Sequence, residues 1–182
     1  MTTFNVHTLE SAPEQSKKLL EKTQKAYGFI PNLYGVFAEA PAAVEAYQGI
    51  NKALSRSSLS PSELQTVLLA VSVDNGCSYC VAAHSTVAQM SNVPDHVVKS
   101  LRDNTTIDDP KLEALRLFAK SVVDKRGWLD ESDLEAFFAA GYGKQQVLEV
   151  ITAISLKTLS NYTNHIANTP LDEPFTKNTW KR

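Results

Sequence analysis

The chain has 182 residues, of which 43% are hydrophobic and 21% charged, and its formal net charge at neutral pH is -2. This length and composition are typical of one globular domain with a buried core, so we expect residues 1–182 to form a single domain. Nucleic acid and anionic membrane surfaces attract clustered Lys and Arg. The weak negative charge therefore predicts that neither is a partner.

The first ten residues lack the basic segment followed by an apolar stretch that marks a secretory signal. No apolar run approaches the roughly 18 residues needed to cross a bilayer. The longest run, near residues 67–73, is interrupted by Ser72. We therefore expect a cytoplasmic protein that does not span a membrane.

Helical patterns recur along the chain, whereas the alternating apolar patterns of strands are absent, which predicts an all-α fold. The first predicted helix covers residues 13–27; it is capped by Ser11 and ends at Gly28, a residue suited to a left-handed helix end. Residues 29–35 are expected to form a connector. A second helix is predicted over residues 42–54.

The third predicted helix has the clearest start signal. Ser60 supplies a capping hydroxyl, Pro61 stands at the first helical position, and Glu63 can bond back to the cap. The helix should end at residues 75–76, an Asn-Gly pair suited to a turn. One buried stripe is expected along it, formed by Leu64, Val67, Leu68 and Val71.

The next helix is expected to begin at Cys77, and four more should follow at residues 94–102, 110–123, 130–140 and 144–167. The helix over residues 110–123 should turn one apolar face inward, formed by Leu112, Leu115, Phe118 and Val122. An aromatic group nearby is interpreted as core packing or a subunit interface. It consists of Trp128, Phe137, Phe138 and Tyr142.

The segment 77–84, CSYCVAAH, carries the chemistry. On a helix, Cys77, Cys80 and His84 fall on one face. The helix N-terminus favours a thiolate, and the imidazole can take its proton. One cysteine oxidised to a sulfenic acid can be resolved by the other as a disulfide. This combination indicates a dithiol redox centre that needs no metal or organic cofactor.

Two other interpretations of the pair remain open. Free cysteines are often simply buried, so the two could be structural neighbours. A Cys-Cys-His zinc site is a second alternative, and His165 would be its candidate fourth ligand. Covalent haem attachment would need a histidine directly after the second cysteine, where this chain has Val81.

Residues 59–84, LSPSELQTVLLAVSVDNGCSYCVAAH, resemble the signature of the carboxymuconolactone decarboxylase-like superfamily in its alkylhydroperoxidase D-like, peroxidase-related branch. The resemblance extends to residues 28–34, 40–41, 164–167 and 170–172. It implies an all-helical bundle that assembles into homo-oligomers, often trimers or hexamers. It also implies a peroxidase cycle in which Cys80 attacks, Cys77 forms the disulfide and His84 relays the proton.

The chain departs from the family at Gln65, where the resemblance implies a glutamate of the proton relay. A neutral amide can orient a partner but cannot accept and pass on a proton. Glu63 lies on another side of the helix and is interpreted as a capping residue. Tyr79, a histidine in some members, is interpreted as a wall of the pocket. We therefore expect weaker or narrower peroxidase activity than in the family's best members.

The leading hypothesis is a cytoplasmic antioxidant enzyme that reduces hydroperoxides through Cys80 and Cys77 and is reset by an external dithiol. A disulfide oxidoreductase or redox sensor with weak peroxidase activity is the first alternative. A non-enzymatic zinc-binding oligomer is the second. Lactone decarboxylation is not expected, because the relatives that catalyse it do without the cysteine pair.

Overall fold

The computed structural model describes residues 4–182, and within them the chain forms nine α-helices and one 3-10 helix but no strand. The all-α prediction is confirmed. The elements are α1 (Glu14–Tyr27), α2 (Asn32–Phe37), α3 (Pro41–Leu54), α4 (Pro61–Asp74), α5 (Ser78–Met90), α6 (Asp95–Arg102), α7 (Pro110–Asp124), α8 (Glu131–Ala139), α9 (Lys144–Ala167) and η1 (Glu173–Asn178).

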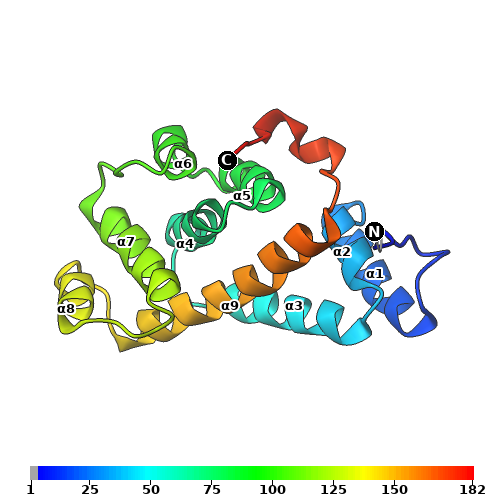
Figure 1. The fold of residues 1–182 in the computed structure, drawn as a ribbon, viewed down its shortest axis with the longest axis horizontal. Helices are drawn as coiled ribbons and strands as arrows, with labels where there is room; N and C mark the ends of the chain where they lie inside the picture. Colours follow the sequence, from blue (N-terminus) through cyan, green and yellow to red (C-terminus); the bar gives the residue numbers. More distant parts are fainter. Residues whose placement is uncertain (1–3) are drawn as a thin grey trace.

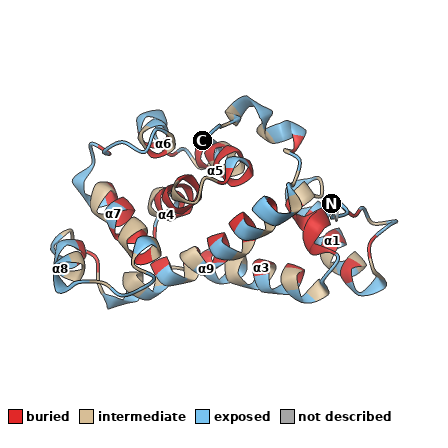
Figure 2. Cartoon of the chain, viewed as in Figure 1, coloured by how far each residue is buried: buried red, intermediate tan, exposed pale blue. Residues whose placement is uncertain are grey.

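Helix α4 is the centre of the fold, and it packs against α5, α6, α7 and α9. Figure 1 shows the long α9 crossing the molecule, with α3 beside it and α1 and α2 near its C-terminal end. Every residue of α4 from Gln65 to Val73 is buried, and so are Tyr79 to Ala82 of α5 (Figure 2). Both cysteines of the motif therefore lie inside the protein.

The capping signals at residues 60–63 act as predicted. Glu63 N–H donates to the Ser60 hydroxyl, and Ser60 N–H donates back to the Glu63 carboxylate. Glu63 also pairs with Lys111 on α7, which supports its interpretation as a structural residue. The single buried stripe predicted for α4 is wrong, because every residue from Gln65 to Val73 is buried. Neighbouring helices cover α4 on all sides.

Two details of the N-terminal region correct the sequence analysis. Pro13 rather than Ser11 precedes α1, and the Ser11 hydroxyl instead accepts a hydrogen bond from Thr8 N–H. The expected connector at residues 29–35 contains the start of α2. Its first amide, Asn32 N–H, donates to the side chain of Asp172, 140 residues later. A cap supplied from so far along the chain leaves no local signal.

The aromatic group of the second half divides between core and surface. Phe137 stacks on Phe118 and on Tyr142, with ring centroids 4.0 and 4.5 Å apart. Trp128, in contrast, is 87% exposed, and Phe138 is partly exposed. Core packing is therefore confirmed only for Phe137 and Tyr142. The inward face predicted for α7 is buried as expected.

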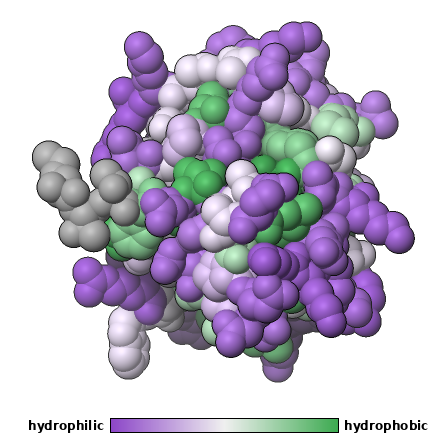
Figure 3. All heavy atoms as spheres, turned by 90° about the vertical axis from the view of Figure 1, so that its right-hand side faces the viewer, coloured by the Kyte–Doolittle hydropathy of each residue, from purple (hydrophilic) through white to green (hydrophobic). Residues whose placement is uncertain are grey.

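The face at the α1 and α2 end carries mainly hydrophilic side chains, with apolar ones between them (Figure 3). None of the described helices is long and apolar enough to cross a membrane.

Candidate functional site

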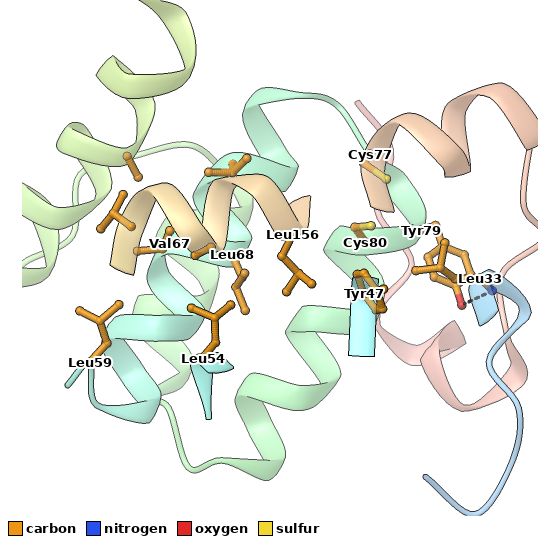
Figure 4. Close-up of a cluster of buried hydrophobic side chains, with 14 of the residues drawn as sticks. Leu33, Tyr47, Leu54, Leu59, Val67, Leu68, Cys77, Tyr79, Cys80 and Leu156 are labelled. Carbon is orange, nitrogen blue, oxygen red and sulfur yellow. Dashed lines mark hydrogen bonds between the residues drawn. The ribbon is translucent and has the colours of Figure 1, made fainter. Parts of the chain in front are cut away.

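The two cysteines lie at the junction of α4 and α5. Gly76 adopts a left-handed conformation (φ 68°) that ends the turn after α4, and Cys77 is the N-cap residue of α5. Cys80 lies in the first turn of α5. Both sulfurs are buried and neither is in a disulfide. Figure 4 shows them close together, with the ring of Tyr47 next to Cys80.

Polar side chains of α9 face the sulfurs. Asn164 Nδ2 lies 3.2 Å from Cys80 Sγ and 3.9 Å from Cys77 Sγ, so its amide can donate to either. Ser160 Oγ is 3.8 Å from Cys80 Sγ. Both residues are buried, which makes each contact electrostatically stronger than it would be in water. The α9 face therefore favours a negatively charged sulfur at Cys80.

The two thiols have opposite acidities. Burial opposes ionisation of Cys80, but the hydrogen bond from Cys77, the charge of Lys157 and the α9 donors outweigh it and hold the pKa of Cys80 well below its ordinary value. The hydrogen bond to Cys80, together with burial, raises the pKa of Cys77. This arrangement gives one nucleophilic thiolate and one protonated partner.

His84 lies one helical turn after Cys80, and Gln65 on α4 positions it. His84 Nδ1 is 3.1 Å from Gln65 Oε1. An amide oxygen only accepts hydrogen bonds, so Nδ1 carries the proton and Nε2 keeps a free lone pair. Burial and the charge of Lys157 lower the pKa of His84 well below its ordinary value. The imidazole is therefore neutral at neutral pH and able to accept a proton.

A cavity of about 880 Å³ opens beside the motif. Cys80, His84 and Gln65 line it, whereas Cys77 does not. The exposed side chains of Tyr27 and Met90 also line it and mark its mouth. Most of the other lining residues are aromatic or aliphatic, among them Phe29, Leu33, Tyr34, Tyr47, Leu54, Leu64, Leu68 and Phe175. The cavity thus gives a molecule with a sizeable apolar body access to Cys80 but not to Cys77.

Tyr79 connects this cavity to the C-terminal segment. Its hydroxyl donates to Asp172 Oδ2 and accepts from Leu33 N–H at 3.3 Å (Figure 4). Burial raises the pKa of Asp172 despite the hydrogen bonds it receives. The Tyr79 ring lines the cavity and packs edge-on against Phe175 of η1. The residue is therefore a wall, as predicted, and also anchors the segment that closes one side of the cavity.

The structure brings together Cys77, Cys80, His84 and Gln65, the four site residues predicted from the sequence. His165 is exposed on the other side of α9 and does not join them. Within residues 4–182, no three His, Cys, Asp or Glu side chains are grouped as metal ligands. The zinc site that would have used His165 therefore lacks its fourth ligand.

The sequence analysis missed the contribution of α9. Lys157, Ser160 and Asn164 follow one another at helical spacing and are all buried. Polar residues at positions where an amphipathic helix should be apolar are the signal that could have revealed them. Tyr47 on α3, whose pKa is raised by burial and by its closeness to Cys80, was also missed.

Residues 38–120 match the model of the Carboxymuconolactone decarboxylase family. The matched stretch contains α3, α4, α5 and the whole cysteine motif. The match covers 83 of the 182 residues, so this stretch of the chain is similar to the family. No curated protein matches its sequence at a significant level.

Solved structures show the same fold over nearly the whole of this chain. The alkylhydroperoxidase AhpD core structure of an uncharacterised peroxidase-related protein from Ralstonia eutropha JMP134 is 22% identical, with a TM-score of 0.83 and 96% of each chain covered. A peroxidase-related protein from Silicibacter sp. TM1040 is 20% identical, with a TM-score of 0.77 and 96% and 95% covered. The fold is thus the alkylhydroperoxidase D-like one.

The debrominase Bmp8 has this fold as well. Its complex with 2,3,4-tribromopyrrole is 19% identical to the present chain, with a TM-score of 0.80 and coverage of 98% of this chain and 96% of that one. One fold therefore serves enzymes with different named reactions.

Proposed function

We propose that this protein is a thiol-dependent peroxidase that reduces organic hydroperoxides through a Cys77–Cys80 dithiol/disulfide cycle. The observation that carries the proposal is the placement of the two thiols: Cys80 lines the cavity and contacts the donors Ser160 and Asn164, whereas Cys77 lies behind it and away from the cavity. A peroxidase of this kind needs a thiolate that the substrate can reach and a resolving thiol beside it.

The first half-reaction takes place at Cys80. Its thiolate attacks the distal oxygen of the hydroperoxide, the O–O bond breaks and an S–O bond forms, leaving a sulfenic acid. The alkoxide leaves as an alcohol after gaining a proton. His84 Nε2, free because Nδ1 binds Gln65, is placed to take a proton from solvent that enters the cavity and to pass it to the leaving oxygen.

In the second half-reaction Cys77 resolves the intermediate. Its sulfur attacks the Cys80 sulfur, water leaves, and a disulfide forms across the first turn of α5. Two thiols have then been oxidised and one hydroperoxide reduced to an alcohol and water. An external dithiol reduces the disulfide and restores both thiols. No bound metal or organic cofactor takes part in this cycle.

The volume and lining of the cavity favour an organic hydroperoxide over hydrogen peroxide. Hydrogen peroxide is little larger than water and gains nothing from aromatic walls, whereas an apolar substrate is stabilised by about 25 cal/mol for each Å² of apolar surface that it buries. The aromatic rings around Cys80 supply that surface. The alternative of a disulfide oxidoreductase or sensor uses the same cysteines but has no need of such a cavity.

The experiment is intact-mass analysis and thiol counting after one equivalent of an organic hydroperoxide or of hydrogen peroxide. We expect fast loss of two hydrogens per chain, reversed by dithiothreitol, and faster loss with the organic hydroperoxide. Retention of both thiols would overturn the peroxidase proposal. If thiol oxidation is then seen only with disulfide substrates, the oxidoreductase alternative is supported. Metal analysis of the same sample tests the zinc-binding alternative directly.

We also propose that residues 1–182 act as one domain and that the chain forms a homo-oligomer, a trimer or hexamer. Helix α4 contributes to both clusters of buried apolar residues, which links the two halves of the chain. On its outer side α9 carries an exposed apolar row at helical spacing, formed by Leu148, Ile151, Tyr162 and Ile166. Light scattering of the purified protein and of Ile151→Glu tests this: a monomeric wild type would refute it.

A further inference from the structure

The cavity contains a basic side chain for which the described structure has no partner. Of the described residues that line it, Lys157 is the only lysine or arginine, and no carboxylate is among them. Lys157 is fully buried, and its Nζ atom has no hydrogen-bond partner among the described residues. By comparison, Lys120 and Lys125 are partly exposed and each pairs with two aspartates.

A buried, unpaired ammonium is costly. Removing an ion from water costs several kcal/mol even after the protein relaxes, unless a charge of opposite sign or strong hydrogen bonds compensate. Lysines are almost never fully buried without such a partner. An anion close to Lys157 Nζ offsets this cost and lets the side chain stay charged.

Helix geometry points Lys157 at the sulfurs. Ser160 and Asn164, three and seven residues further along α9, lie on the same side of the helix as Lys157. Their side-chain atoms lie 3.8 and 3.2 Å from Cys80 Sγ. Lys157 and Cys80 also line the same cavity. The anion nearest to the ammonium is then the Cys80 thiolate.

We propose that Lys157 is a positioning residue whose buried charge holds Cys80 as a thiolate and keeps His84 neutral. The inference rests on the proposed function, since it assigns the source of the nucleophile. The charge of Lys157 acts in this direction on both Cys80 and His84.

Other ionisable groups around Cys80 do not supply this charge. Cys77 and Tyr47 face it from α5 and α3, and their pKa values are raised, so both are neutral. Tyr79 is held neutral by burial and by its bond to Asp172. His84 is neutral for the reasons given above. Lys157 alone among these neighbours is a cation, which makes its removal a sharp test.

The test measures the pH dependence of Cys80 alkylation by iodoacetamide, resolved from Cys77 by peptide mass spectrometry, in the reduced full-length protein. Lys157→Met keeps the shape of the side chain and removes the charge, Lys157→Arg keeps the charge, and Lys120→Met is a control that removes a lysine outside the cavity lining. We expect Lys157→Met to move the alkylation midpoint to higher pH by one unit or more, about a tenfold loss of rate on the acid side.

Lys157→Arg should retain most of the low midpoint, and Lys120→Met should leave it unchanged. An unchanged midpoint in folded Lys157→Met would overturn the proposal. Wild-type protein gives a second measurement that needs no variant: relative to free cysteine, Cys80 should prefer anionic iodoacetate over neutral iodoacetamide. Absence of that preference would also count against Lys157. Neither readout involves peroxide, so a peroxidase failure is distinguishable from a failure of this inference.

Discussion

His84 Nδ1 and Gln65 Oε1 lie 3.1 Å apart, and this single contact between α5 and α4 determines which imidazole nitrogen is free. The sequence analysis interpreted Gln65 only as a loss, because an amide cannot relay a proton. In the structure the amide fixes the tautomer that leaves Nε2 available. His84 is therefore the one residue of the proton relay, and Gln65 orients its imidazole.

Changing Gln65 tests how much the shorter relay limits the rate. Gln65→Glu places a carboxylate against Nδ1–H, which makes His84 more basic and should raise the rate of peroxide reduction by roughly tenfold. Gln65→Leu removes the acceptor and should lower it. Stopped-flow measurement of thiol oxidation checks both variants. A rate that does not rise in Gln65→Glu would mean that His84 does not limit proton transfer.

Replacement of the two cysteines should interrupt the peroxidase cycle at different steps. Cys80→Ser removes the nucleophile, so peroxide consumption should fall to the background rate. Cys77→Ser leaves the nucleophile without a resolving thiol, so one equivalent of peroxide should yield a stable sulfenic acid that dimedone traps at Cys80. Mass spectrometry locates the adduct. Trapping at Cys77 in the Cys80→Ser protein instead would reverse the assigned roles.

The pH dependence of the wild-type reaction follows from the direction in which the pKa values of Cys80 and His84 are shifted. The pKa values of Cys80 and His84 are both lowered, so both groups are in their reactive forms at neutral pH. Activity should therefore be lost as pH falls, not gained as pH rises toward the ordinary thiol pKa of about 8.5. Stopped-flow rates across this range check it. A rate that climbs with a midpoint near the ordinary thiol value would contradict the assignment of a preformed thiolate.

Local signals made most of the fold predictable. Residues 144–167 and 110–123 were placed as helices from apolar spacing, and the capping box at Ser60 located the start of α4. The cysteine motif was predictable for the same reason, since its three side chains lie within two turns of one helix. Such features depend on neighbours in the chain, so the sequence contains them.

Features that depend on contacts across the chain were not predictable. Helix α2 is capped by Asp172, and Lys157 lines the same cavity as Cys80, which lies 77 positions earlier. Both relationships need the tertiary fold before they exist. The buried polar row on α9 was visible as a departure from amphipathic spacing, but nothing in the sequence paired it with the cysteines. The cavity is lined by residues of α1, α2, α3, α4, α5, α9 and η1, so it was not predictable for the same reason.

Tyr79→Phe tests whether the C-terminal segment is held by the hydroxyl that Tyr79 presents to Asp172. The ring and its contact with Phe175 remain, but Asp172 keeps only its bond from Asn32 N–H and is left partly unsatisfied in a buried position. Loss of one partner from such a pair costs about 1–3 kcal/mol, so the free energy of unfolding should fall by that amount in urea titrations.

The matched control for this substitution is Tyr162→Phe, which removes the hydroxyl of an exposed tyrosine on α9. Surface changes of this kind shift stability by about 0.5 kcal/mol or less. Limited proteolysis gives the local readout: cleavage after α9 should become faster in Tyr79→Phe and stay unchanged in the control. Because Pro174 and Phe175 line the cavity, a loosened segment should also weaken the preference for organic hydroperoxides over hydrogen peroxide. Equal stability and equal cleavage in the two variants would show that packing of the ring, not the hydroxyl, holds the segment in place.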